Sequence, residues 1–82
     1  MKVKVANRMY GMSREEYRGL LKIASDQVPF GIFAIEKGDY AELRCDICKS
    51  MTQLKTLSRQ FRGQGFRVLS NNGKKVMHDA GL

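Results

Sequence analysis

The chain has one histidine, one proline, two cysteines and no tryptophan, and these shortages limit its chemistry. Its only thiol and imidazole groups are Cys45, Cys48 and His78, so a zinc site with four such ligands would need a second chain. Two cysteines are also too few for the disulfide framework of a small secreted domain. No Ser-His-Asp set, phosphate-cradling loop or interpretable pair of carboxylates is present. We therefore expect a protein that is not an enzyme and that needs no cofactor or metal.

The sequence also lacks a long apolar run. No stretch approaches the roughly 20 apolar residues of a membrane-spanning helix, and the first eight residues alternate apolar and polar side chains, unlike a signal peptide. A hydrophobic content of 43% is nevertheless enough for a folded chain. We expect one domain over residues 1–82, with a frayed tail at 79–82, located in the cytoplasm and without membrane contact.

The most informative shortage is that of acidic residues in the second half of the chain. No aspartate or glutamate occurs from Cys48 to His78, whereas residues 23–47 hold five acids and two bases. The whole chain has a net charge of +7. Basic charge gathered in this way favours a polyanionic partner, either nucleic acid or an acidic protein surface. The alternative is that the charge only keeps a small domain soluble.

Two amphipathic helices are predicted, each beginning at a capping box. Ser13 with Glu16 begins a helix over residues 14–25, and Ser50 with Gln53 begins a helix that ends near Arg62. The first apolar face comprises Tyr17, Leu20, Leu21 and Ala24, and the second comprises Met51, Leu54, Leu57, Ser58 and Phe61. The opposite sides carry basic stripes, Arg14, Arg18 and Lys22 on the first helix and Lys55, Arg59 and Arg62 on the second.

Five strands are predicted, over residues 2–6, 30–37, 40–47, 66–70 and 74–78. Gly38-Asp39 fits a type II′ hairpin that pairs Lys37 with Tyr40, and Asn71-Asn72-Gly73 indicates a second hairpin. Strict alternation from the first hairpin predicts a core face of Phe30, Ile32, Ala34, Leu43, Cys45 and Ile47. The same alternation predicts an open face of Phe33, Ile35, Tyr40, Glu42 and Arg44.

The order of elements, β-α-β-β-α-β with an added strand, predicts an α+β fold. With right-handed crossovers, both helices would cover one face of a mainly antiparallel sheet of four or five strands, in the ferredoxin-like order 4-1-3-2. Strand 30–37 would then be an edge, although Phe33 and Ile35 are apolar. We expect that edge to be covered by a second copy, which would form a homodimer.

Cys45-Asp46-Ile47-Cys48 has the CxxC spacing of redox and zinc sites. In a strand, positions i and i+3 lie about 10 Å apart on opposite faces, which is too far for a disulfide. We expect structural cysteines, with Cys45 in the core and Cys48 incidental. A zinc site shared across a dimer and redox chemistry remain alternatives.

The leading functional hypothesis is a small, basic, non-enzymatic nucleic-acid-binding module, with RNA or a single strand as the favoured ligand. Exposed lysine and arginine side chains beside aromatic side chains suit phosphate contact combined with stacking on nucleobases. The residues predicted to contact phosphate are Lys2, Lys4, Arg44, Lys55, Arg59, Arg62 and Arg67, and those predicted to stack are Phe33 and Tyr40. The alternative is a regulatory or inhibitory protein, of the kind that mobile elements encode, whose basic face binds a host protein or a nucleoprotein enzyme.

Overall fold

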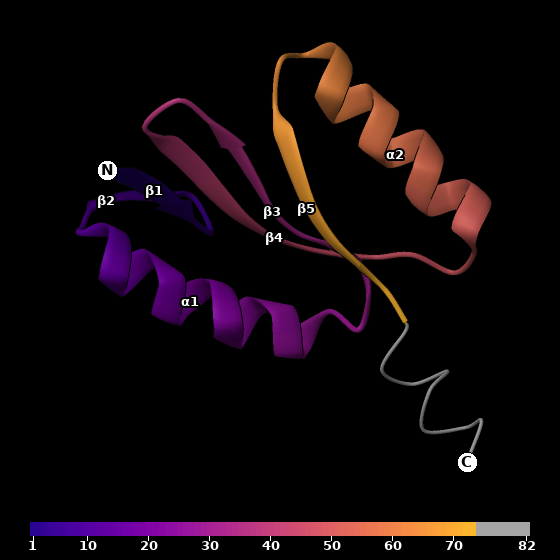
Figure 1. Cartoon of the computed structure of the whole chain (residues 1–82), viewed down its shortest axis with the longest axis horizontal. Coiled ribbons are helices and arrows are strands. Elements are labelled where there is room, and N and C mark those ends of the chain that lie inside the picture. Colours follow the sequence, from indigo (N-terminus) through magenta and orange to yellow (C-terminus); the bar gives the residue numbers. More distant parts are fainter. Residues whose placement is uncertain (74–82) are drawn as a thin grey trace.

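The computed structural model describes residues 1–73, which form five strands and two helices (Figure 1). In chain order these are β1 (Lys2–Val5), β2 (Arg8–Gly11), α1 (Arg14–Gln27), β3 (Phe30–Lys37), β4 (Tyr40–Ile47), α2 (Met51–Gly63) and β5 (Arg67–Asn72). The strand expected at 74–78, the frayed tail and His78 lie outside the described residues.

All five strands belong to one mixed sheet in the order β2-β1-β4-β3-β5. The pair β1–β4 is parallel, and the other three pairs are antiparallel. The α+β class is therefore confirmed. The order 4-1-3-2 is wrong, because β5 pairs with β3 and not with β1. The strand at 30–37 is consequently internal, so it offers no free edge to a second copy.

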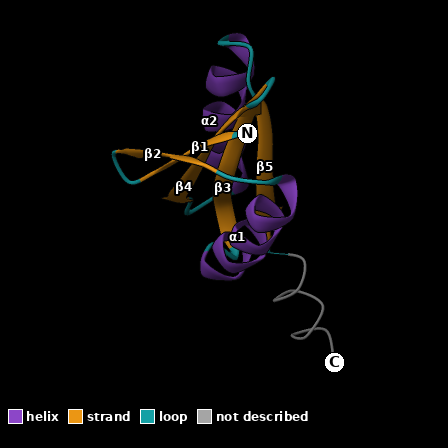
Figure 2. Cartoon of the chain, turned by 90° about the vertical axis from the view of Figure 1, so that its left-hand side faces the viewer, coloured by secondary structure: helices purple, strands orange, loops and turns teal. Residues whose placement is uncertain are grey.

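The short strand β2 is the element that the sequence did not indicate. Residues Ala6 and Asn7 turn the chain so that β2 returns antiparallel along β1, and the hairpin projects beyond the rest of the sheet (Figure 2). Every residue of β2 is exposed, so its sequence carries no alternation of buried and exposed side chains. This reversal before α1 makes β1 run parallel to β4.

The prediction that both helices cover one face is wrong: they cover opposite faces of the sheet, which runs between them in Figure 1. One apolar cluster contains Leu54 of α2 with Ile32 and Ile35, and the other contains Tyr17 of α1 with Val3 and Ala41. The strand order accounts for this arrangement. β2 and β4 run in opposite directions, and both crossovers lead toward the same edge of the sheet. Right-handed connections then require α1 on one face and α2 on the other.

Both helices begin where the sequence predicts. The Ser13 side chain accepts from the Glu16 N–H at 3.1 Å, and the Glu16 carboxylate accepts from the Ser13 N–H at 3.1 Å. These bonds lower the pKa of Glu16, since they favour its charged form. Ser50 accepts from the Gln53 N–H at 3.1 Å, whereas the Gln53 side chain accepts from Lys49 and not from Ser50. The second capping box is therefore displaced by one residue.

A bulge in the centre of the sheet overturns part of the predicted face assignment. The register of β3 shifts between Ile32 and Ala34 against both neighbours, and Arg44 with Cys45 of β4 stands opposite Phe33 alone. Ile32 therefore shares a face with Ile35 instead of with Ala34, and both are buried in the cluster beneath α2, which covers the face predicted to be open. The two other wrong assignments are Cys45 and Ile47, which are exposed.

The predicted hairpins had different outcomes. Lys37 pairs with Tyr40 as expected, and Gly38 has a φ of +60°, as the first central residue of a type II′ turn does. Asn71 and Asn72, by contrast, continue β5 and pair with β3 instead of forming a turn. The Asn71 side-chain amide donates to the carbonyls of Ser25 and Val28, which ties the end of α1 to β5.

Candidate nucleic-acid interface

The outer side of α2 carries three exposed cations, Lys55, Arg59 and Arg62. In an α-helix these positions lie on one side, separated along the axis by about 6 Å and about 4.5 Å. Within residues 1–73, the ion pairs involve none of the three. No acidic residue occurs on the helix, so its stripe remains uncompensated. The structure therefore brings these three predicted contact residues together on one accessible surface.

Lys37 extends this basic surface at the C-terminal end of α2, although it belongs to β3. Its ammonium group donates to the carbonyl of Gln64 at 3.0 Å and lies 5.2 Å from the centroid of the Phe66 ring. Both contacts hold the cation beside the helix end, where unpaired carbonyl groups favour positive charge. The sequence pattern contained no signal for this placement, because it depends on how β3 and α2 meet.

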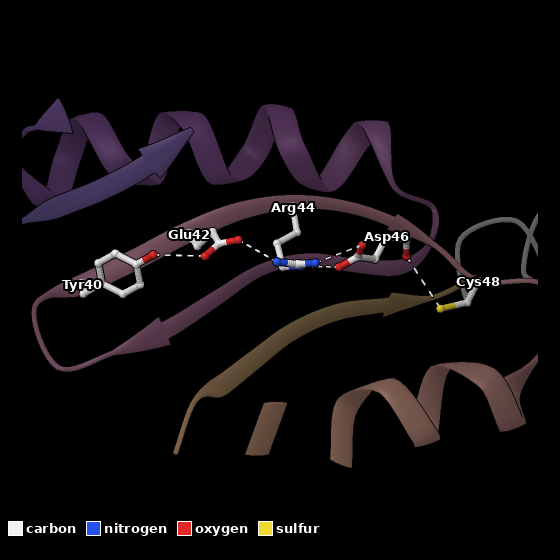
Figure 3. A network of polar contacts seen from close by, with 5 residues as sticks. All are labelled: Tyr40, Glu42, Arg44, Asp46 and Cys48. Atoms are coloured by element: carbon white, nitrogen blue, oxygen red, sulfur yellow. Dashed lines mark hydrogen bonds and ion pairs between the residues drawn. The ribbon is translucent and has the colours of Figure 1, made fainter. Parts of the chain in front are cut away.

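Arg44 is held in a polar ladder along β4, shown in Figure 3. Its guanidinium donates to Glu42 at 2.6 Å on one side and forms an ion pair with Asp46 on the other. The Tyr40 hydroxyl donates to the second oxygen of Glu42 at 3.0 Å. These residues lie at alternate positions of one strand, so they share a face of the sheet. A single cation is thus shared between two carboxylates.

The ladder also packs against the aromatic side chains beneath α2. The Arg44 guanidinium lies 4.7 Å from the centroid of the Phe61 ring, and its side chain is only 29% exposed. The hydrogen bond to Asp46 raises the pKa of Arg44, against the opposing effect of burial. This geometry leaves Arg44 with no uncompensated charge for a phosphate group. The pattern Glu42-x-Arg44-x-Asp46 could have indicated the neutralisation from sequence alone, since period two places all three on one face.

Both predicted stacking residues are partly enclosed. The Tyr40 ring lies 6.4 Å from that of Phe66, which in turn meets Phe61 edge-on at 6.4 Å. Burial and the hydrogen bond to Glu42 raise the pKa of Tyr40. Phe33 is half-buried at the bulge of β3. Tyr40 is therefore committed to internal contacts, and of these two residues only Phe33 has no ring contact within residues 1–73.

The remaining predicted bases lie on other elements. Lys2 and Lys4 of β1 stand opposite Tyr40 and Glu42 of β4. Arg67 begins β5, is 77% exposed at its side chain, and lies 4.0 Å from Glu36. The basic stripe of α1 lies on the helix that covers the opposite face, where Glu15 and Glu16 occupy the first turn. The two helical stripes thus do not form one continuous surface.

The two cysteines have exchanged the positions that alternation predicted. Cys45 is exposed, whereas Cys48 is 5% exposed and packs with Ile32, Ile35 and Leu54. Cys48 follows Arg44 and Asp46 at the next alternate position, on the face that α2 covers, and its N–H bonds to the Phe30 carbonyl at 2.9 Å. Burial raises the pKa of the Cys48 thiol. The part of the chain that the structure describes contains no group of three potential metal ligands.

Comparisons with known proteins add no assignment to this geometry. In residues 1–73, no helix combines the length and apolar character needed to cross a membrane. No protein-family model matches the chain, and neither a curated protein nor a solved structure matches it.

Proposed function

We propose that the protein is a non-enzymatic nucleic-acid-binding module whose contact surface is the outer side of α2. The observation that carries this proposal is the contrast between Arg44 and the three basic side chains of α2. Arg44 is neutralised by two carboxylates, whereas Lys55, Arg59 and Arg62 lie exposed on a helix without an acidic residue. Such a surface attracts polyanions and gains affinity by releasing the counterions that surround nucleic acid.

The proposed contact is with the phosphate backbone and not with the bases. Backbone contact needs cations at suitable spacing and no particular sequence of bases. Base stacking would need free aromatic rings, and Tyr40 already packs on Phe66. The expected preference for RNA or a single strand therefore depends on Phe33 alone. We place this function in the cytoplasm, where free thiols such as Cys45 and Cys48 remain reduced.

The salt dependence of binding tests the proposal. Fluorescently labelled single-stranded and duplex oligonucleotides are titrated with the protein at several salt concentrations. Log K should fall linearly with log salt, by about 0.7 per phosphate contact for a single strand and about 0.9 for a duplex. Replacing Lys55, Arg59 and Arg62 together by Gln should make the slope shallower by about 2 for a single strand or about 3 for a duplex.

The matched control changes the same amount of charge on the other helix. Replacing Arg14, Arg18 and Lys22 by Gln also removes three positive charges, but from the helix that covers the opposite face of the sheet. The slope should then stay within about one contact of the unmodified protein. Equal losses in the two variants would show that net charge alone drives association, and would refute an interface on α2.

Absence of binding to every oligonucleotide at low salt would also end this proposal. In that event the α2 surface would be assigned to an acidic protein partner, as expected for the regulatory or inhibitory alternative. Capture from a lysate before and after nuclease treatment distinguishes the two. Partners that depend on nucleic acid should be lost on nuclease treatment, whereas a direct protein partner should remain and should be lost with the α2 variant.

A further inference from the structure

The outer edge of β2 is the second accessible surface with defined chemistry. β2 ends the sheet, and within the described residues it pairs with β1 alone. Its two large apolar side chains are exposed to solvent, Met9 to 51% and Tyr10 to 45%. A sheet edge of this kind can accept a further strand, because its outward backbone groups have no partner in the sheet.

The hydrogen-bond pattern shows which backbone groups point outward. The Met12 N–H donates to the Met1 carbonyl at 3.0 Å, and the Met1 nitrogen donates to the Met12 carbonyl at 2.8 Å. Hydrogen-bonded pairs alternate with non-bonded pairs in an antiparallel ladder. In the β1–β2 register, Tyr10 and Arg8 therefore bond to β1. The N–H and C=O groups of Met9 and Gly11 are left facing away from the sheet.

The side chains around this edge are of two kinds, basic and apolar, and each apolar side chain has a basic neighbour. Residues 1–12 contain three bases and no acid. On one face of β2, Tyr10 is followed at the next same-face position by Arg8. On the other face, Met9 stands directly opposite Lys4 of β1. Each face of the edge thus offers one apolar side chain beside one cation.

We propose that the β2 edge binds an extended, acidic segment of a partner protein by strand addition. The outward groups of Met9 and Gly11 would supply main-chain hydrogen bonds, which give this mode its affinity. Apolar residues of the segment would contact Met9 and Tyr10, and its carboxylates would lie within reach of Arg8 and Lys4. The selectivity for acidic segments comes from the cations on both faces.

A second copy of this chain is a poorer occupant of the same edge. Its hairpin would bring a second set of Lys2, Lys4 and Arg8 beside the first, with no acid among residues 1–12 to balance them. Two four-residue strands are also far smaller than the roughly 20 residues per side of a stable interface. The edge is separate from the proposed nucleic-acid surface as well, because α2 packs on β3 and β5 at the other side of the sheet.

The test uses the full chain and a labelled decapeptide of alternating valine and glutamate. Binding is measured by fluorescence anisotropy, and amide shifts are followed by NMR. The shifts should be largest at Met9 and Gly11, and small along α2. A peptide with lysine in place of glutamate should bind at least about tenfold more weakly, and so should a peptide N-methylated at its edge-facing amides.

The matched variants are Met9→Pro and Met9→Ala. Proline removes the outward N–H without removing a bond to β1, as edge positions permit. Met9→Pro should therefore weaken binding clearly more than Met9→Ala, which retains the N–H. The N-methylated peptide tests the same bond without altering the protein, in case Met9→Pro does not fold.

Three results would overturn the proposal. The first is equal binding of the glutamate and lysine peptides, or binding of neither. The second is a set of peptide-induced shifts confined to α2. The third is a dimer, measured by sedimentation, that Met9→Pro converts to a monomer, since this would assign the edge to a second copy.

Discussion

Replacing Gly31 by alanine should be among the most damaging single substitutions in this protein. Gly31 lies buried in β3, paired on one side with Ile47 and on the other with Asn71. Its φ is +148°, a conformation that side-chain-bearing residues rarely adopt. A Cβ atom at this position would lie 2.0 Å from the carbonyl oxygen of Asp46 and 3.1 Å from the nitrogen of Cys48. Both neighbours are backbone atoms, so no side chain can move aside to make room.

The magnitude follows from two costs. Holding alanine in this conformation costs about 1–3 kcal/mol. Separating β3 from β4 to admit the methyl group adds about 1–3 kcal/mol, as overpacking of a tight interior does. The sum of about 2–6 kcal/mol is comparable with the whole stability expected for a chain of this size, roughly 4–12 kcal/mol. The variant should therefore unfold at much lower urea concentration, or fail to fold.

Two other glycines provide controls within the same chain. Gly38→Ala meets no atom within 4 Å but keeps a φ of +60°, so it should cost only about 1–2 kcal/mol. Gly19→Ala, in α1 and also without a neighbour within 4 Å, should stabilise by about 0.5–1 kcal/mol through helix propensity. Urea unfolding followed by circular dichroism measures all three. A Gly31→Ala variant no less stable than Gly38→Ala would refute the close approach of β3 and β4.

Three further predictions concern single side chains. Ala6→Gly should raise the free energy of unfolding by about 0.5–1 kcal/mol in urea titrations, because Ala6 has a φ of +48° in the β1–β2 turn. Cys48→Ser should cost about 1–3 kcal/mol, whereas Cys45→Ser should change stability by no more than about 0.5 kcal/mol; a thiol reagent should modify Cys45 in the folded protein much faster than Cys48. Burial and a 2.5 Å hydrogen bond to Glu36 raise the pKa of Tyr17 above its ordinary 10.0. The protonated hydroxyl therefore stabilises the folded state fully below pH 10.0, and this stabilisation is lost as the pH rises further. Between about pH 9 and about pH 11, Tyr17→Phe should reduce the fall of the free energy of unfolding with pH by up to about 1.4 kcal/mol per pH unit. An unchanged slope would contradict this assignment.

The features that were predictable from sequence are those decided within a few residues. Ser13 and Ser50 cap helices because the bonds that they accept come from residues three positions away. Gly38 forms its turn for a similarly local reason, since only the first central position requires a positive φ. The basic stripe of α2 is local as well, because helical periodicity alone places its three cations on one side.

The order of strands was not predictable in this way. Right-handedness limits how α2 crosses the sheet but leaves open which edge β5 joins, and each choice places α2 on a different face. Pairing with β3 satisfies the backbone hydrogen-bonding groups on one side of β5, and it places Asn71 where its side chain caps the end of α1. The β1–β2 hairpin escaped detection because a strand exposed on both faces carries no periodic signal.

The bulge explains only part of the errors in side-chain placement. Alternation assumes a constant register, and the shift between Ile32 and Ala34 breaks that register within β3. Ile32 and Ile35 then enter the same cluster although they are three residues apart. The assignments of Cys45 and Ile47 failed for another reason: β4 keeps its alternation, and α2 covers the face of Arg44 and Asp46 instead of the face of Cys45 and Ile47.

The placement of α1 and α2 on opposite faces has a consequence for how this small protein can unfold. The two apolar clusters share no residue, so each helix is supported by its own set of contacts and only the sheet connects them. Loss of α2 would uncover Ile32 and Ile35 while leaving Val3, Tyr17 and Ala41 packed. Partial opening can therefore begin on one side without the other, as in proteins whose cooperative units exchange their amide hydrogens separately. An unfolding event on the α2 side would remove the basic surface while the β2 edge stayed intact.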